Sequence, residues 1–246
     1  KVVDITGYTS EDLIGSEPSL LSSTMQSEQF YREMWRTIGA SGSWEGEVWD
    51  QRKSGELFPL LIAITAIRDA KDRLTNYVFS FSDITATKRD ADAIHKLAYF
   101  DPLTHLPNRR TLIDRLPDTL SACESERKTL GLLFVDLDHF KDINDALGNH
   151  VGDKILIGTA QRLRDAVASG DTVARIGGDD FVVVLKTLDS NIETAKAEAN
   201  TVATHILASL NRPYEIDQQE IRCAASIGVA LADQGQISIE ELLKQA

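Results

Sequence analysis

Residues 173–185 read VARIGGDDFVVVL, and two apolar runs in this stretch flank a Gly-Gly pair. Apolar, largely β-branched runs on both sides of a glycine pair predict a β-hairpin, whose turn at Gly177 and Gly178 is expected to need positive φ angles. Two carboxylates, Asp179 and Asp180, follow the turn. A surface hairpin with solvated acids would show the same pattern, so its meaning depends on the rest of the chain.

A second stretch, residues 130–153, reads LGLLFVDLDHFKDINDALGNHVGD. Its continuous apolar run over residues 130–135 predicts a strand buried on both faces. Asp136 and Asp138 follow at a spacing of two, so their side chains are expected on the same side of the strand. Carboxylates at the end of a buried strand are costly to desolvate without a cation, and a divalent ion with oxygen ligands is the usual partner. The pattern indicates Mg²⁺ with a nucleoside triphosphate.

Three motifs together resemble those of the GGDEF family, the diguanylate cyclases. They are DPLTHLPNRR at residues 101–110, DLDHFKDINDALGNHVGD at residues 136–153 and RIGGDDF at residues 175–181. The resemblance covers most of residues 99–246. It implies an α+β fold similar to the palm of nucleotidyl cyclases and polymerases, with a central, mainly antiparallel sheet flanked by helices.

The hydrophobic pattern of this region predicts strands interleaved with helices. In chain order, we expect a helix over 108–120, a strand over 130–135, a helix over 151–167, the hairpin over 173–185, a helix over 192–210, a strand over 221–231 and a helix over 238–246. The two acid-bearing stretches can then meet on adjacent central strands.

The resemblance implies an enzyme that condenses two GTP molecules into cyclic di-GMP and two pyrophosphates, with Mg²⁺ or Mn²⁺ as cofactor. Metal ions and positioning supply most of the catalysis in such phosphoryl chemistry. The family's metal-binding positions correspond to Asp136, the Leu137 carbonyl, Asp179 and Asp180. Asp179 and Asp180 also match its catalytic acids.

Further positions match those that contact GTP in the family. They correspond to Phe140 and Lys141 at the triphosphate, Asn144 and Asp153 at the guanine, and Gly177 and Gly178 where phosphates approach the backbone. An amide and a carboxylate can pair with the O6 and the N1/N2 edge of guanine. Glycine leaves room at the backbone that a side chain would fill.

The chain departs from the family pattern at Asp180, at the inhibitory site and at Asn149, which stands where His is usual. Asp180 stands where Glu is usual, which shortens the carboxylate by one methylene and affects the expected activity more than the expected GTP binding. The family's inhibitory site for its own product is Arg-x-x-Asp, and here it reads Ala168-Ser169-Gly170-Asp171. Without the Arg, a bidentate hold on the product is lost, so we predict that this site is non-functional.

Residues 1–83 resemble a PAS sensory domain that lacks its first strands, in the segments ITGYTSEDLIG, WEGEVWDQRKSGE and SDIT. Three alternating segments from Trp44 onward predict three strands, and Ser10 is a plausible helix N-cap. No histidine or cysteine lies in this region, so we expect neither histidine-ligated haem nor a flavin-cysteine adduct. The PAS ligand itself is unknown from sequence.

Residues 84–98 are expected to form a helical linker between the PAS domain and a GGDEF domain at residues 99–246. Apolar residues close to a heptad spacing allow either a short coiled coil or a solvated connector. The resemblance favours a coiled coil and hence a homodimer. Because family members continue into a basic segment, the GGDEF domain is expected to be truncated at its C-terminus.

The composition limits which further partners, such as nucleic acid or a membrane, are expected. The 246 residues carry a net charge of −12, which argues against non-specific nucleic-acid binding. No apolar stretch approaches the length of a membrane span, and the two cysteines lack metal-ligand spacing, so we expect a cytoplasmic protein without a membrane segment.

Two functional hypotheses remain open from sequence. The first is a PAS-regulated diguanylate cyclase that works as a dimer in bacterial second-messenger signalling. The second is a catalytically poor GTP-binding module that controls an attached EAL phosphodiesterase domain. The sequence of the GGDEF-like region also resembles GGDEF domains that precede an EAL domain in the same polypeptide. Asp180 and the expected absence of the C-terminal basic segment are the features that distinguish them.

Overall fold

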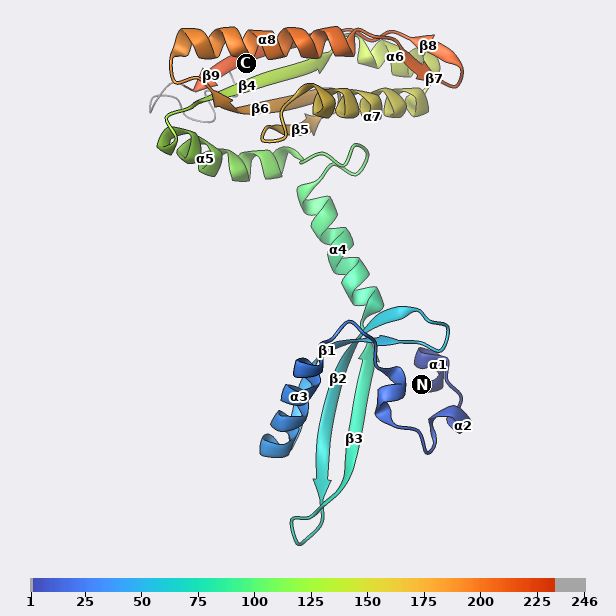
Figure 1. Ribbon diagram of the computed structural model, residues 1–246. Helices are drawn as coiled ribbons and strands as arrows, with labels where there is room; N and C mark the ends of the chain where they lie inside the picture. Colours follow the sequence, from blue (N-terminus) through green and yellow to red (C-terminus); the bar gives the residue numbers. More distant parts are fainter. Residues whose placement is uncertain (1, 233–246) are drawn as a thin grey trace. The chain divides into compact units, whose positions relative to one another are not determined.

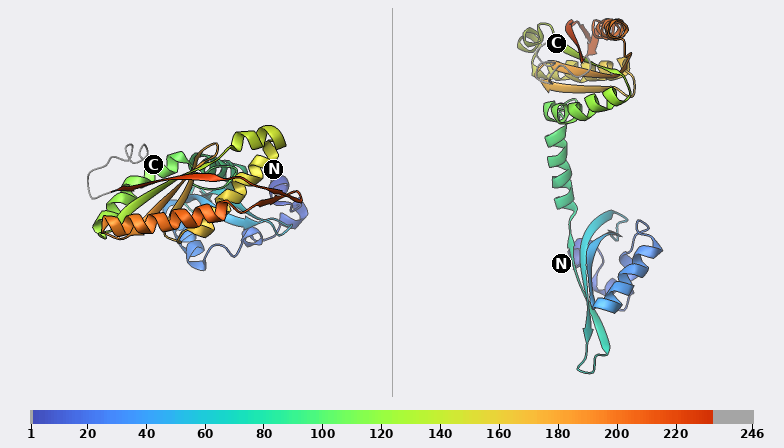
Figure 2. Two further views of the ribbon diagram at one scale, coloured as in Figure 1. Left: turned by 90° about the horizontal axis from the view of Figure 1, so that it is seen from above. Right: turned by 90° about the vertical axis from the view of Figure 1, so that its left-hand side faces the viewer.

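The structure is a computed structural model and describes residues 2–232. The chain divides into two compact units, residues 1–93 and residues 94–246, each of which is described by itself (Figures 1 and 2). This division falls inside the predicted linker, and the predicted domain boundaries themselves stay a prediction. No helix in the described part of the chain is long and apolar enough to cross a membrane.

The first unit is a three-stranded antiparallel sheet with short helices. The strands are β1 (Ser43–Gln51), β2 (Leu57–Arg68) and β3 (Leu74–Asp83), in the order β1-β2-β3. The helical segments are α1 (Val2–Thr6), α2 (Ser10–Leu13), η1 (Pro18–Leu21) and α3 (Glu28–Ser41). The three predicted strands are thus confirmed. The N-cap of α2 is Thr9 and not Ser10, because Thr9 and Asp12 form a reciprocal capping box.

The second unit is built on a four-stranded antiparallel sheet in the order β5-β6-β4-β9. Its strands are β4 (Thr129–Leu137), β5 (Thr172–Gly177), β6 (Asp180–Leu188) and β9 (Ala225–Ala232). The helices are α5 (Arg109–Ser125), α6 (Phe140–Leu147), α7 (Asn149–Ala166) and α8 (Ile192–Leu210). A small hairpin adds β7 (Tyr214–Ile216) and β8 (Gln219–Ile221).

The sheet of this unit is covered on both faces, as Figures 1 and 2 show for α5 and α8. One core layer joins β4 and β6 to α7 and α8 through residues such as Leu133, Val183 and Ile155. A separate layer joins the opposite face to α5 through residues such as Leu116 and Leu132. Strand β4 is therefore buried on both faces, as its continuous apolar run predicts.

The sequence predictions for this unit need correction at several points. Helix α6 and the β7-β8 hairpin were not predicted, and the expected strand over 221–231 begins only at Ala225. The turn between β5 and β6 contains no positive φ at Gly177 or Gly178. A register shift between Arg175 and Gly177 accompanies the turn and changes the local twist, so the hairpin is not the regular two-residue type that needs positive φ. The predicted helix over 238–246 lies outside the described residues.

The predicted linker is helical, with α4 spanning Thr85–Tyr99. Ile94 and Leu97 on this helix are 67% and 64% exposed. Large apolar side chains at this exposure are available for a partner helix, so the predicted coiled coil stays a proposal.

Candidate metal and nucleotide site

Three carboxylates meet at one end of the central strands of the second unit. Asp136 lies near the end of β4 and pairs in register with Asp180, the first residue of β6, while Asp179 lies in the turn before it. Each of the three offers an oxygen atom, and these atoms lie within 4.8 Å of one another. The predicted meeting of the two acid-bearing stretches therefore occurs.

The cluster is electrostatically unbalanced. Burial raises the pKa of Asp136, and the negative charges of Asp179, Asp180 and Asp138 raise it further. Within residues 2–232, no Lys or Arg forms an ion pair with these three clustered carboxylates. Closely spaced oxygen ligands without a cationic partner suit a divalent ion such as Mg²⁺. Asp138 lies outside the cluster, and its Oδ1 accepts a hydrogen bond from Ser226 at 2.8 Å.

Arg175 fixes the turn that carries these acids. Its Nε and Nη2 donate to the Gly178 carbonyl at 3.0 and 2.6 Å, and its Nη1 lies 2.9 Å from Asp101 Oδ1. Asp101 in turn accepts hydrogen bonds from the backbone N–H and hydroxyl of Thr104. The first motif thus supports the glycine turn. The sequence analysis did not predict that Arg175 joins the two motifs. The signal for it was the position of an arginine two residues before the glycine pair.

The predicted guanine-binding residues lie on neighbouring helices, Asn144 on α6 and Asp153 on α7. Asn144 Oδ1 is buried without a hydrogen-bond partner in the described chain. It lies over Gly152, where an added Cβ would fall 1.8 Å from it and 3.1 Å from the Phe140 ring. The absence of a side chain at Gly152 therefore brings Asn144 close to the residue preceding Asp153, which is a role that sequence reasoning missed.

The predicted triphosphate contacts begin α6. The Phe140 ring is buried in the core, so only its backbone N–H, in the first turn of the helix, is suited to a phosphate. Lys141 follows it with an exposed side chain. Leu137 is buried, and a role for its carbonyl stays a prediction. Gly178 has open space where a side chain would lie, as close approach of a phosphate requires.

Comparison with known proteins identifies this unit. Residues 98–246, more than half of the chain, match the family model described as diguanylate cyclase, GGDEF domain. The chain belongs to the GGDEF family. Residues 1–86 match a PAS domain model, which confirms the predicted order of a PAS domain followed by a GGDEF domain.

Related proteins agree with this assignment. The bifunctional diguanylate cyclase/cyclic di-GMP phosphodiesterase MucR of Pseudomonas aeruginosa is 40% identical over 147 residues, covering 60% of this chain and 21% of MucR. Diguanylate cyclase TpbB of the same species is 40% identical over 135 residues, covering 54% of this chain and 30% of TpbB. The chain therefore spans less than a third of either relative.

Solved structures show the same fold. The GGDEF domain of TpbB is 37% identical with a TM-score of 0.55, covering 59% of this chain and 83% of that structure. A sensory box/GGDEF family protein from Caulobacter crescentus is 36% identical with a TM-score of 0.55, covering 61% of this chain and 93% of that structure. The predicted α+β fold is thereby confirmed.

At the predicted inhibitory position of the GGDEF domain, the Asp171 carboxylate accepts hydrogen bonds from the backbone. Asp171 Oδ2 accepts from the Ala168 N–H at 3.2 Å, and its Oδ1 accepts from the Lys186 N–H at 3.0 Å. Both carboxylate oxygens thus bind local backbone, and Ala168 offers no cation. This arrangement supports the prediction that the site does not hold the product.

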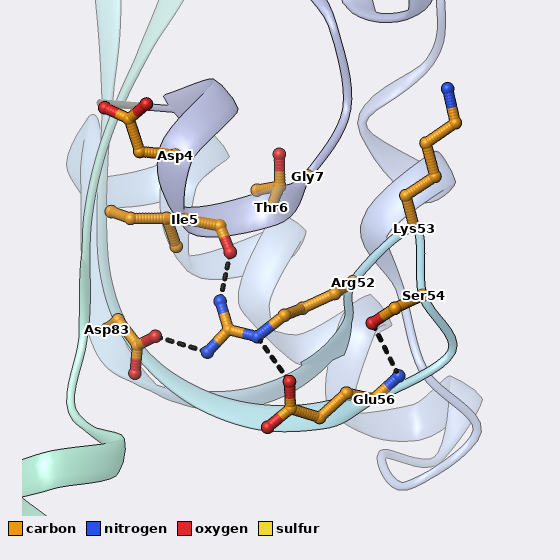
Figure 3. A pocket seen from close by; sticks show the side chains of 9 residues that line it. All are labelled: Asp4, Ile5, Thr6, Gly7, Arg52, Lys53, Ser54, Glu56 and Asp83. Atoms are coloured by element: carbon orange, nitrogen blue, oxygen red, sulfur yellow. Dashed lines mark hydrogen bonds and ion pairs between the residues drawn. The ribbon is translucent and has the colours of Figure 1, made fainter.

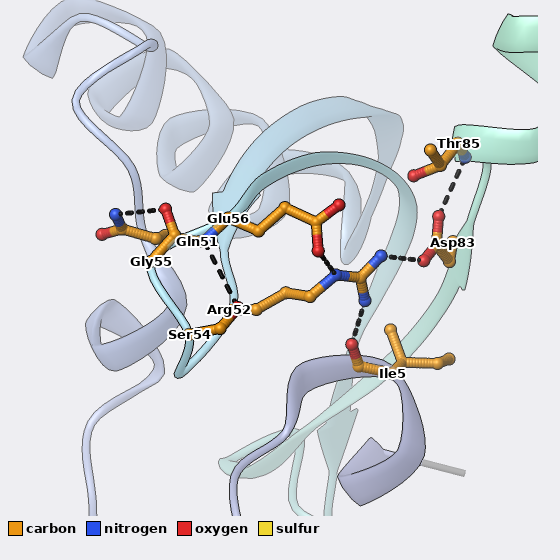
Figure 4. Close-up of polar contacts among 8 residues, drawn as sticks. All are labelled: Ile5, Gln51, Arg52, Ser54, Gly55, Glu56, Asp83 and Thr85. Carbon is orange, nitrogen blue, oxygen red and sulfur yellow. Dashed lines mark hydrogen bonds and ion pairs between the residues drawn. The ribbon is translucent and has the colours of Figure 1, made fainter.

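The PAS domain contains a polar pocket lined by Arg52 and Lys53, both of which are already in ion pairs, Lys53 with Asp12 at 2.6 Å (Figure 3). Arg52 donates to the Ile5 carbonyl and lies 2.5 Å from Asp83 and 3.1 Å from Glu56 (Figure 4). Asp83 accepts from the backbone N–H of Thr85 at 2.8 Å, at the start of α4. Burial raises the pKa of Asp83, but these bonds from Thr85 and Arg52 bring it below its ordinary value. The contacts of Arg52 and Asp83 in this pocket therefore connect α1, the sheet and the start of α4.

Proposed function

We propose that this chain is a diguanylate cyclase that converts two molecules of GTP into cyclic di-GMP and two pyrophosphates, under control of its PAS domain. The observation that carries the proposal is the cluster of Asp136, Asp179 and Asp180 at the end of the central strands of a GGDEF domain. The position of Asn144 on α6, against Gly152 and hence close to Asp153 on α7, supports nucleotide binding beside it. The family match does not favour the alternative of a purely regulatory module.

The residues divide the chemistry between them. The 3′-hydroxyl of one GTP attacks the α-phosphorus of the other, a new O–P bond forms, and the bond to pyrophosphate breaks. Asp136, Asp179 and Asp180 would hold Mg²⁺, which neutralises charge on the phosphate oxygens and the leaving group. We assign to Asp180 the additional role of accepting the proton of the attacking hydroxyl.

The remaining residues bind and orient the substrate. Asn144 and Asp153 would pair with guanine, and the α6 N-terminus with Lys141 would hold the triphosphate. The turn at Gly177 and Gly178 would leave space for the α-phosphate. Because each protomer presents one GTP, the reaction requires two copies, and we propose a cytoplasmic homodimer.

Turnover of GTP with Mg²⁺, followed by chromatography of cyclic di-GMP, tests the proposal. We expect the wild-type chain to make product, Asp136→Ala to abolish it, and Asp118→Ala, an exposed acid on α5, to leave it unchanged. Asp180→Glu restores the longer carboxylate and is expected to raise turnover. If the wild type binds GTP without turnover while Asp180→Glu gains activity, the chain is a GTP-binding regulatory module instead.

A further inference from the structure

The PAS domain holds a second cavity, of about 730 Å³, between the sheet and the segment from η1 to α3. Its walls are mainly apolar and aromatic, including Met34, Trp35, Phe79 and Phe81. This volume lies in the range of cavities that enclose drug-sized ligands. Among the residues that line it there is no Lys, Arg or His, so the cavity offers an anion no positive charge.

One charged residue lines this cavity from within the sheet. Asp50 on β1 is only 6% exposed, and within residues 2–232 burial is the one influence on the pKa of its carboxyl, with no hydrogen bond or ion pair beside it. Burial raises the pKa of its carboxyl to about 6, so the group is largely ionised at neutral pH. An ionised carboxylate that is buried without a partner is strongly unfavourable.

A second polar group of this cavity is also buried without a hydrogen-bond partner. The Tyr31 hydroxyl on α3 is buried and has no hydrogen-bond partner in the described chain. Burial raises the pKa of this hydroxyl, the nearby Ser22 side chain lowers it, and the charge of Asp50 raises it further. The cavity thus contains an unpaired carboxyl and an unpaired hydroxyl within aromatic walls.

We propose that this cavity binds a small organic cation, an amine with an apolar body, whose ammonium group pairs with Asp50. The ammonium supplies the positive charge and donors that Asp50 lacks. Aromatic walls attract a cation through their ring faces and bury its apolar body. An anionic ligand would instead place like charges together. The proposal does not depend on the catalytic activity proposed for the GGDEF domain.

Three probes of one shape and different charge test the proposal on the chain 1–246. They are 4-phenylbutylamine, 4-phenylbutanol and 4-phenylbutyrate, titrated by calorimetry at pH 7.5. We expect the amine to bind at least about tenfold more tightly than the alcohol, as a hydrogen-bonded charge pair provides. The carboxylate is expected to bind more weakly than the alcohol.

Two matched carboxylate-to-amide variants locate the effect. Asp50→Asn is expected to remove the preference for the amine, while Glu17→Gln, an exposed acid on the cavity rim, retains it. Tryptophan fluorescence during urea unfolding checks that each variant is folded. The proposal is overturned if the amine binds no better than the alcohol, if no probe binds, if the preference survives in Asp50→Asn, or if Glu17→Gln removes it.

Discussion

Arg175 and Asp101 form an ion pair of 2.9 Å in which both side chains are largely shielded, at 13% and 17% exposure. The same guanidinium donates twice to the Gly178 carbonyl, so one side chain joins the loop of the first motif to the turn that carries Asp179. The planar fork of arginine is what allows these contacts in two directions at once.

The first prediction concerns this fork. Arg175→Lys keeps the charge but cannot hold both Asp101 and Gly178, so the glycine turn loses its fixed position. We expect the rate of GTP turnover to fall by about tenfold to a hundredfold, as misplacement of reacting groups commonly produces. GTP affinity, measured by equilibrium titration, should change little. Arg110→Lys, an exposed arginine of the same motif paired with Asp114, should leave the rate intact.

A methyl group at Gly152 tests the nucleotide site. Gly152→Ala would displace Asn144, because no space exists between them, and GTP affinity should fall by about tenfold or more. Gly170→Ala is the control, since its Cβ would meet open space. Equal GTP affinity of Gly152→Ala and wild type would contradict the role given to Asn144. Circular dichroism would separate lost binding from lost folding.

Divalent ions should stabilise the GGDEF domain through the acid cluster. A cation that binds the folded state relieves the repulsion that raises the pKa of Asp136, and binding raises the unfolding temperature by mass action. We expect millimolar Mg²⁺ to raise the thermal midpoint of the wild type and EDTA to reverse it. Asp136→Ala should abolish the shift, and an unchanged shift in this variant would place the ion elsewhere.

Product inhibition should be weak. Asp171 binds the Ala168 and Lys186 backbone N–H groups, and no arginine stands at position 168 to hold a second guanine or phosphate. A titration with cyclic di-GMP should show no tight binding at this turn, while Ala168→Arg is expected to introduce some. Tight binding by the wild type that Asp171→Asn abolishes would show that the site works without its arginine.

Asp50 should make the stability of the PAS domain depend on pH. Burial raises its pKa from 3.8 to about 6, so between these values the folded state keeps a proton that the unfolded state has lost. Stability therefore falls as pH rises from about 4 to about 6 and levels off above that. Asp50→Asn should remove this fall and make the domain up to about 3 kcal/mol more stable at pH 7 than the wild type. The two proteins compared differ only at residue 50, so the other polar residues of the cavity, Tyr31 and Glu17, are the same in both.

All three tryptophans, Trp35, Trp44 and Trp49, belong to the PAS domain, so their fluorescence reports its unfolding alone. Urea titrations at pH 5 and pH 7.5 would measure the Asp50 effect. A wild-type stability that does not change between these values would contradict the prediction.

Features set by local pattern could be predicted from sequence. The strand over 130–135 has a continuous apolar run because β4 is covered on both faces, and α8 has the predicted bounds because Asn191 caps its start. The acids follow these elements in order, so the meeting of Asp136 with Asp180 followed from the topology. The family motifs also assign Asn144 and Asp153 to guanine, and this assignment stays a prediction.

Features that depend on tertiary contact escaped prediction. Helix α6 is too short for its periodicity to stand out, and its start follows His139 in a left-handed conformation without a side-chain cap. The bulge beside Gly177 replaced the expected left-handed turn. The burial of Asp50 depends on residues from η1 and α3, whose spatial arrangement its own strand pattern does not encode.

Strand β4 is hydrogen-bonded to β6 on one side and β9 on the other, and core layers cover both of its faces. Separating such a strand from its neighbours costs nearly as much as unfolding the whole domain. Asp136 is therefore anchored to the part of the domain that deforms least. We therefore expect any signal that changes turnover to leave the Asp136 end of the acid cluster in place.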